Sequence, residues 1–255
     1  PSNLIKECVA ICSFDLVTCS PLIIVEASPS LKDRELKMNK HHYIIVDVET
    51  TGDDRVADFG AVVVNRKGAV VGSLGVLIDG IFGNVDFHWA LGNPKHTLKK
   101  YQGMLARGSR AIASPAFVND WLRQMQSAYS PILTAYNIGF DWGKCRNTDI
   151  DLGIFSQRFD LMMAAKNVIC GRDDYAKACY DNDWLTAGGK VSSKADHVAR
   201  FIDPTLPEEP HTALEDARDY ENAILQFIIN QPTSRKKLLD AGMAKNPSAK
   251  WMLGA

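Results

Sequence analysis

The stretch Tyr43-Ile44-Ile45-Val46-Asp47-Val48-Glu49-Thr50 joins an apolar, β-branched run to two acids at its end. A run of this length and composition is typical of a buried strand. Because strand side chains alternate between faces, Asp47 and Glu49 project to the same side. Acids at the end of an internal strand need cations or similar partners, since burying a bare carboxylate is costly. The stretch therefore predicts a central strand of an α/β sheet with a functional site at its end.

A second acidic signal is Asn137-Ile138-Gly139-Phe140-Asp141, which follows an apolar run at 132–136. The run predicts another buried strand, and the residues after it predict a helix beginning near Phe140. Taken singly, Asn137 is most simply a turn or helix cap and Phe140 a core residue. At a strand–helix junction, Asp141 becomes a candidate ligand for a metal ion.

The third signal is His211-Thr212-Ala213-Leu214-Glu215-Asp216 at the start of an apolar helical pattern. Thr212 and Glu215 match a capping box, which makes Glu215 a helix-start residue rather than a ligand. Asp216 then lies in the first turn, and His211 lies just outside the helix on a more mobile segment. Four carboxylates and an imidazole, gathered in one pocket, would hold two divalent cations and activate a water.

The order of patterns along the chain predicts a mixed α/β sheet with helices on its faces. Three strands with short connections come first and favour an antiparallel meander, and strand–helix alternation follows. The expected strands are 43–48, 57–64, 69–78, 132–136 and 159–161. The expected helices are 97–107, 115–128, one from about 140, 193–201 and 212–229.

Composition narrows the class of protein. The 255 residues are 46% hydrophobic and 23% charged, with a net charge of −1, which is ordinary for a globular domain. A protein that coats nucleic acid is usually more basic, so a nucleic-acid partner would be held locally in a groove. Six cysteines without a Cys-x-x-Cys pair favour reduced thiols in a reducing compartment. A zinc site from Cys170, Cys179 and His197 is the alternative, although its spacing matches no standard site.

The two ends of the chain lie outside this pattern. We expect residues 1–37 to be an appendage or linker, with Met38 as the natural start. The apolar segment at 8–25 contains Asp15 and Pro21, which argues against a signal or membrane segment. The tail at 231–255 is basic and is expected to be a solvated helix or a weak phosphate contact.

The three motifs resemble those of the DEDDh group of 3′–5′ exonucleases, in the ribonuclease H-like superfamily. Asp47, Glu49 and Thr50 match its first motif, while Asn137, Phe140 and Asp141 match its second. His211 and Asp216 match the third, and the stretch 114–135 is most like phage-encoded members. One departure is Asp58, where the family usually carries Glu. The resemblance implies a five-stranded mixed sheet and an exonuclease domain at about 38–230.

The resemblance also implies a chemistry. Two Mg²⁺ or Mn²⁺ ions would be held by the four acids Asp47, Glu49, Asp141 and Asp216, with His211 as general base. Thr50 and Thr51 would contact the terminal 3′-hydroxyl, and Asn137 and Phe140 would contact substrate. The implied product is nucleoside 5′-monophosphate, released from the 3′ end of single-stranded DNA in the cytoplasm (the host cytoplasm if the chain is phage-encoded).

Alternatives remain open on the residues themselves. The chain could trim RNA with the same fold, or grip nucleic-acid ends without catalysis. His88, Trp89 and Tyr101 are further candidate contacts to substrate, and no membrane partner is expected. Arg107 and Arg110 are either phosphate contacts or a solvated pair.

Overall fold

The computed structural model describes residues 42–231, which form a six-stranded sheet in the order β4-β3-β2-β1-β5-β6. The predicted appendage at 1–37 and all but the first residue of the predicted tail at 231–255 lie outside the described residues. The strands are β1 (His42–Thr50), β2 (Val56–Asn65), β3 (Val70–Ile78), β4 (Ala111–Ala113), β5 (Ile132–Ala135) and β6 (Arg158–Asp160).

The sheet is mixed, as predicted. Strand β2 runs antiparallel to both β1 and β3, whereas β4 is parallel to β3, β5 to β1 and β6 to β5. The prediction of an α/β fold, with an antiparallel meander followed by parallel strands, is confirmed. The expected number of five strands is wrong by one, because β4 has only three residues and no periodicity of its own to reveal it.

The longer helices are α2 (Pro94–Ala106), α3 (Pro115–Tyr129), α4 (Ile138–Arg146), α5 (Leu161–Val168), α6 (Asp173–Asp181), α7 (Ala195–Ile202) and α9 (Asn222–Ile229). Short turns of 3₁₀ helix are η1 (Trp89–Leu91) and η2 (Leu152–Ile154). Ser114 caps α3 by accepting a hydrogen bond from the Phe117 N–H, with Pro115 at the first position, as the sequence predicts. Helices α5 and α6 were not predicted.

Alternation along β1 divides the core between the two faces of the sheet. Ile44, Val46 and Val48 pack with residues of α2, α3 and α4. Tyr43 and Ile45 pack on the other face with residues of α5, α6, α7 and α9. Asp47 and Glu49 continue this second series, so β1 directs them to the face that carries α9.

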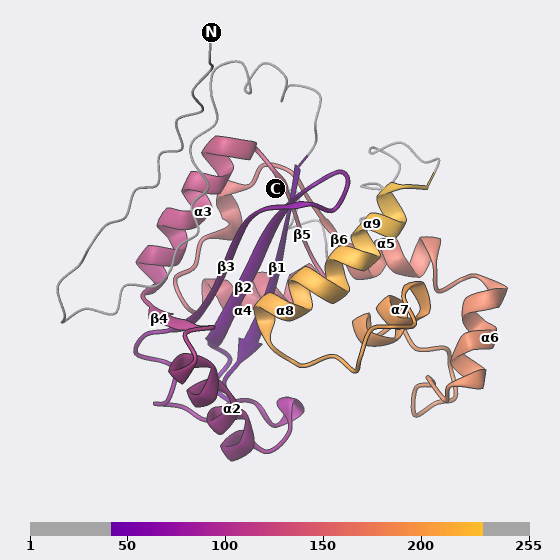
Figure 1. Ribbon diagram of the computed structural model, residues 1–255, viewed down its shortest axis with the longest axis horizontal. Coiled ribbons are helices and arrows are strands. Elements are labelled where there is room, and N and C mark those ends of the chain that lie inside the picture. Colours follow the sequence, from indigo (N-terminus) through magenta and orange to yellow (C-terminus); the bar gives the residue numbers. More distant parts are fainter. Residues whose placement is uncertain (1–41, 232–255) are drawn as a thin grey trace, which may run out of the picture.

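The last helix is continuous through α8 (Ala213–Glu215), the π-helical segment η3 (Asp216–Glu221) and α9. In Figure 1 it crosses the face of the central strands, with α6 and α7 lying beyond it. Its start lies directly on Gly60 of β2, where a Cβ atom would stand 2.1 Å from the Ala213 carbonyl carbon. Glycine is therefore required for the helix to approach the sheet this closely. No helix among residues 42–231 is long and apolar enough to cross a membrane.

We predict that Gly60→Ala destabilises the fold by about 1–3 kcal/mol or more, because the added methyl meets backbone that cannot rotate away. Urea unfolding of the purified protein measures this change. Gly143→Ala is the matched control, because a Cβ on this helical residue meets no described atom within 4 Å. It should be neutral or stabilising by about 0.5–1 kcal/mol. Equal effects of the two substitutions would contradict the close packing at Gly60.

Candidate active site

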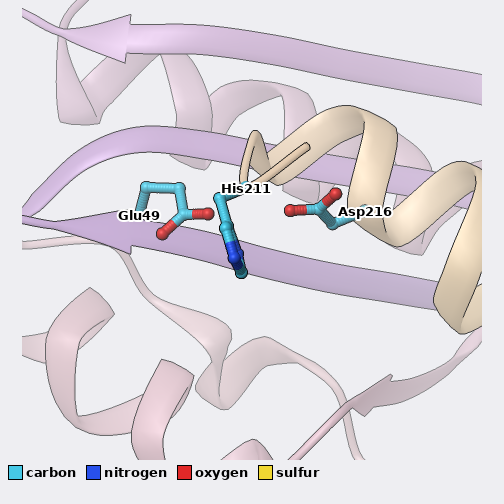
Figure 2. Close-up of side chains that lie close together, drawn as sticks. All are labelled: Glu49, His211 and Asp216. Atoms are coloured by element: carbon cyan, nitrogen blue, oxygen red, sulfur yellow. The ribbon is translucent and has the colours of Figure 1, made fainter. Parts of the chain in front are cut away.

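Glu49, His211 and Asp216 meet at the end of β1. They come from the strand itself, from the segment before α8 and from the first residue of η3. One ligand atom from each lies within 4.8 Å of the others. Figure 2 shows the imidazole between the two carboxylates, both of which point toward it. Side chains more than 160 residues apart in the sequence thus form one group of potential metal ligands.

Asp47 and Asp141 are not in the group that meets within 4.8 Å, but Asp47 acts electrostatically on Glu49 and Asp216, and Asp141 acts on Asp47. Burial raises the pKa of Asp47 well above its usual range, and the charge of Asp141 raises it further. Burial likewise raises the pKa of Asp141, while the Val48 N–H lowers the pKa of both acids by hydrogen bonding. Burial followed by repulsion from Asp47 and Asp216 raises the pKa of Glu49.

Asp216 shows most directly that the site suits a cation. Its Oδ2 accepts a hydrogen bond from the Thr212 N–H at 2.8 Å. Its Oδ1 is buried and has no hydrogen-bond partner among the described residues. Burial, and then repulsion from Asp47 and Glu209, raises the pKa of Asp216 to about 9. An anchored carboxylate with one unpartnered buried oxygen among other acids fits a divalent cation.

His211 is held through its backbone. Its φ of 52° lies in the left-handed region, which a residue with a side chain adopts at a cost of about 1–3 kcal/mol. Lys100 Nζ donates to the His211 carbonyl at 3.0 Å and also to the Pro210 carbonyl. The imidazole itself is about half exposed, with Nδ1 3.8 Å from Oε2 of Glu209. Burial and the charge of Lys100 lower the pKa of His211, which favours the neutral base.

Asp58 fixes the helix that carries Asp216. Its buried carboxylate accepts hydrogen bonds from the Tyr101 hydroxyl at 2.9 Å and the Ala213 N–H at 3.0 Å. The guanidinium of Arg110 donates to it at 3.2 Å and also pairs with Glu215. Asp58 therefore links β2 to α2, to the segment before β4 and to the start of α8.

These contacts overturn three sequence-based expectations. Arg110 is only 4% exposed and paired, so it neither contacts phosphate nor belongs to a solvated pair. Tyr101 is buried against Phe87 and is not a surface contact for substrate. The capping box is also wrong in detail. Asp216 rather than Glu215 bonds the Thr212 N–H, because the buried Arg110 holds Glu215.

The residues expected to contact substrate differ in burial and in backbone conformation. Thr50 and Thr51 are buried, and the Thr51 hydroxyl donates within its own turn to the Arg55 carbonyl at 3.1 Å. Asn137 precedes α4 in a left-handed conformation, and its side chain makes no capping hydrogen bond. Phe140 is 44% exposed, which excludes the core alternative, and Lys144 Nζ stands 4.9 Å from its ring centroid.

The loop beside the first motif adds an exposed aromatic side chain. The His88 N–H donates to the Thr50 carbonyl at 2.8 Å, so this loop is tied to the end of β1. The next residue, Trp89, is 74% exposed. Exposed aromatic side chains thus lie beside the first motif (Trp89) and within the second motif (Phe140).

Sequence reasoning missed Lys100, Glu209, Asp160 and Glu221. Lys100 lies in α2 and Glu209 in the segment before α8, and the partners of both are set only by the fold. Asp160 and Glu221 had a weak signal, because each is an acid within a largely apolar pattern. The zinc alternative is not supported. Across residues 42–231, the one cluster with metal-ligand geometry is that of Glu49, His211 and Asp216.

Comparison with known proteins adds a distant structural likeness. No family model and no curated protein matches this chain. A solved structure described as exonuclease X in complex with 5′ overhanging duplex DNA matches at 18% identity and a TM-score of 0.36. The match covers 78% of this chain and 99% of that chain. A likeness at this level does not establish a function for the chain.

We predict that the metal-free protein loses stability as pH rises from 6 to 8.5. The ordinary pKa of Asp216 is 3.8 and its folded value is about 9, so the folded state holds a proton that the unfolded state releases. Between these values, rising pH therefore favours the unfolded state. Calorimetry in EDTA should show a falling Tm, and Mg²⁺ should raise the Tm more at pH 8.5 than at pH 6. A Tm in EDTA that rises over this range would contradict the buried acid cluster.

Proposed function

We propose that this chain is a metal-dependent 3′–5′ exonuclease of the DEDDh type, which hydrolyses the terminal phosphodiester bond of single-stranded DNA and releases nucleoside 5′-monophosphates. The observation that carries the proposal is the approach of Glu49, Asp216 and His211 to within 4.8 Å of one another. Asp47 and Asp141 add charge to the same place. Buried acids with an exposed imidazole beside them are suited to hydrolysis rather than to stability.

With His211 kept as the base, the four carboxylates offer only oxygen donors, which fit hard cations such as Mg²⁺ or Mn²⁺. We assign Asp47, Glu49, Asp141 and Asp216 as the residues that hold two such ions. When bound, the ions stabilise the negative charge that develops on the phosphate and on the departing 3′ oxygen. The unpartnered Oδ1 of Asp216 supports this assignment, because a buried oxygen of this kind needs a positive partner.

His211 acts in this proposal as the general base that takes a proton from the attacking water. Its lowered pKa keeps the imidazole neutral and able to accept a proton near pH 7. Lys100 donates a hydrogen bond to the His211 carbonyl and so fixes the backbone there. The position from which the imidazole extends beside Glu49 and Asp216 is therefore defined. Half exposure of the ring leaves it open to water and substrate.

Substrate recognition is assigned to the rim of the site. The turn at Thr50 and Thr51 contacts the terminal 3′-hydroxyl, and Asn137 and Phe140 contact the terminal nucleotides. The exposed ring of Phe140 suits stacking on a base, which favours a single strand over a closed duplex. The near-zero net charge of the chain fits local grip at an end rather than coating of a long polymer.

The location of the activity is proposed from the cysteines. Cys145, Cys170 and Cys179 carry free thiols, and Cys145 and Cys179 are buried. Free thiols in the described part of the chain fit a reducing compartment such as the cytoplasm.

Digestion of a 5′-labelled single strand tests the proposal. We expect a ladder of products shortened from the 3′ end in Mg²⁺, complete loss in EDTA, and protection of a 3′-blocked strand. Asp216→Asn should abolish shortening while the protein stays folded. Asp219→Asn is the control, because Asp219 pairs with Arg218 on the surface of the same helix. Stronger digestion of RNA than of DNA would indicate the RNA-trimming alternative, and binding without cleavage would indicate an end-binding module.

We predict that His211→Ala lowers the rate of cleavage by a factor on the order of 10²–10⁴. The loss should appear in kcat, because the imidazole acts on a proton and not on substrate binding. Single-turnover cleavage in saturating Mg²⁺ measures this effect. Retention of full activity by His211→Ala would assign the proton transfer to another group.

A further inference from the structure

Glu221 is a buried carboxylate that the three motifs do not include. It closes the π-helical segment η3, of which Asp216 is the first residue. In a π-helix the hydrogen bonds join residues five apart, so residues at this spacing lie above one another. The side chains of Asp216 and Glu221 therefore project from the same side of the helix toward β1. An α-helix in this segment would turn the second acid away from the first.

The two oxygens of Glu221 have different environments. Oε1 accepts a hydrogen bond from the Tyr136 N–H at 3.3 Å, which anchors the carboxylate at the end of β5. Oε2 is buried and has no hydrogen-bond partner among the described residues. Glu221 as a whole is only 3% exposed. Asp216 has the same arrangement, with one oxygen on a backbone N–H and the other unpartnered.

The charges around Glu221 are those of the proposed metal ligands. Burial raises its pKa well above the usual range, and repulsion from Asp47 and then Asp141 raises it further. The Tyr136 N–H that holds this carboxylate directly follows β5, the parallel neighbour of β1, and Asp141 lies five residues further on in α4. Glu221 and Asp216 thus approach the same acids from one helix.

Two other buried acids show what a structural role looks like in this fold. Asp58 receives three hydrogen bonds, from Tyr101, Arg110 and Ala213, and satisfies both of its oxygens. Asp160 also has one unpartnered buried oxygen, Oδ2, but its Oδ1 caps α5 by accepting from the Met163 N–H. Glu221 lies at the C-terminal end of η3, and its side chain makes neither a helix-capping hydrogen bond nor an ion pair within residues 42–231, so neither structural role accounts for it.

We propose that Glu221 is a fifth carboxylate of the cation site, with Oε2 directed to the ions beside Asp47 and Asp141. The inference rests on the proposed function, because it concerns the same metal centre. The four motif carboxylates carry four negative charges, which balance two divalent cations. A fifth negative charge therefore makes the centre net negative and raises its affinity for cations.

Mn²⁺ binding to the full chain, measured by calorimetry without nucleic acid, tests the role of Glu221. Glu221→Gln keeps the shape of the side chain and removes its charge. We expect it to weaken Mn²⁺ affinity by about 10- to 100-fold, in the range seen when groups around a metal are removed. Asp219→Asn, on the exposed side of η3, should bind Mn²⁺ as the unmodified chain does.

Thermal unfolding supplies a second measurement. In EDTA, Glu221→Gln should raise the Tm, because it removes a buried acid whose charged form is opposed by burial and by the neighbouring acids. In Mn²⁺ its gain in Tm should be smaller than that of the unmodified chain. If the Gln amide packs poorly and lowers the Tm, Glu221→Met removes the same charge without a polar atom, and the same loss of affinity is expected.

The outcomes separate this inference from the proposed function. Unchanged Mn²⁺ affinity in Glu221→Gln and Glu221→Met, with loss in Asp216→Asn, would overturn the role of Glu221 and leave the metal centre intact. Failure of the unmodified chain to bind Mn²⁺ would overturn the proposed function itself and this inference with it.

Discussion

The buried carboxylate of Asp58 is the interaction on which the position of the site depends. It joins β2 to α2 through Tyr101, to the segment before β4 through Arg110 and to the last helix through the Ala213 N–H. Removing one partner of a buried, hydrogen-bonded ion pair costs about 3–5 kcal/mol, because the other charge stays buried. Gly60 is the second constraint, because its lack of a side chain lets the start of the helix lie against β2. Together they fix where the third motif meets β1.

Holding the site together works against electrostatic repulsion. Asp47, Glu49, Asp141 and Asp216 each have a raised pKa because burial and neighbouring acids oppose their charged forms. The left-handed backbone at His211 adds local strain. Lys100 stabilises this conformation by donating a hydrogen bond to the His211 carbonyl. A cluster of this kind lowers the stability of the metal-free fold. Bound cations, rather than packing, would offset this loss of stability.

Much of this arrangement could be predicted from local patterns. Strand β1 was evident from its apolar run, and the start of α3 from Ser114 and Pro115, because these signals depend on neighbouring residues alone. Arg110 was misassigned because its partners, Asp58 and Glu215, lie 52 and 105 residues away in the sequence. Strand β4 was missed because three residues become a strand only by pairing with β3. The π-helical register of η3 likewise has no signal in local helix propensity, because the π-helix is rare and short.

Glu215 and Asp216 show why an acid's role depends on its partner rather than on its motif. They are neighbours on one turn, yet Glu215 bonds the buried Arg110 while Asp216 bonds the Thr212 N–H and keeps one oxygen unpartnered. The first acid holds the helix against the sheet, and the second faces Glu49 and His211. A change in helical register that exchanged these directions would pair Asp216 with Arg110 and take its charge away from Glu49 and His211. The contact between Asp58 and the helix start therefore protects the charge of the site as well as its shape.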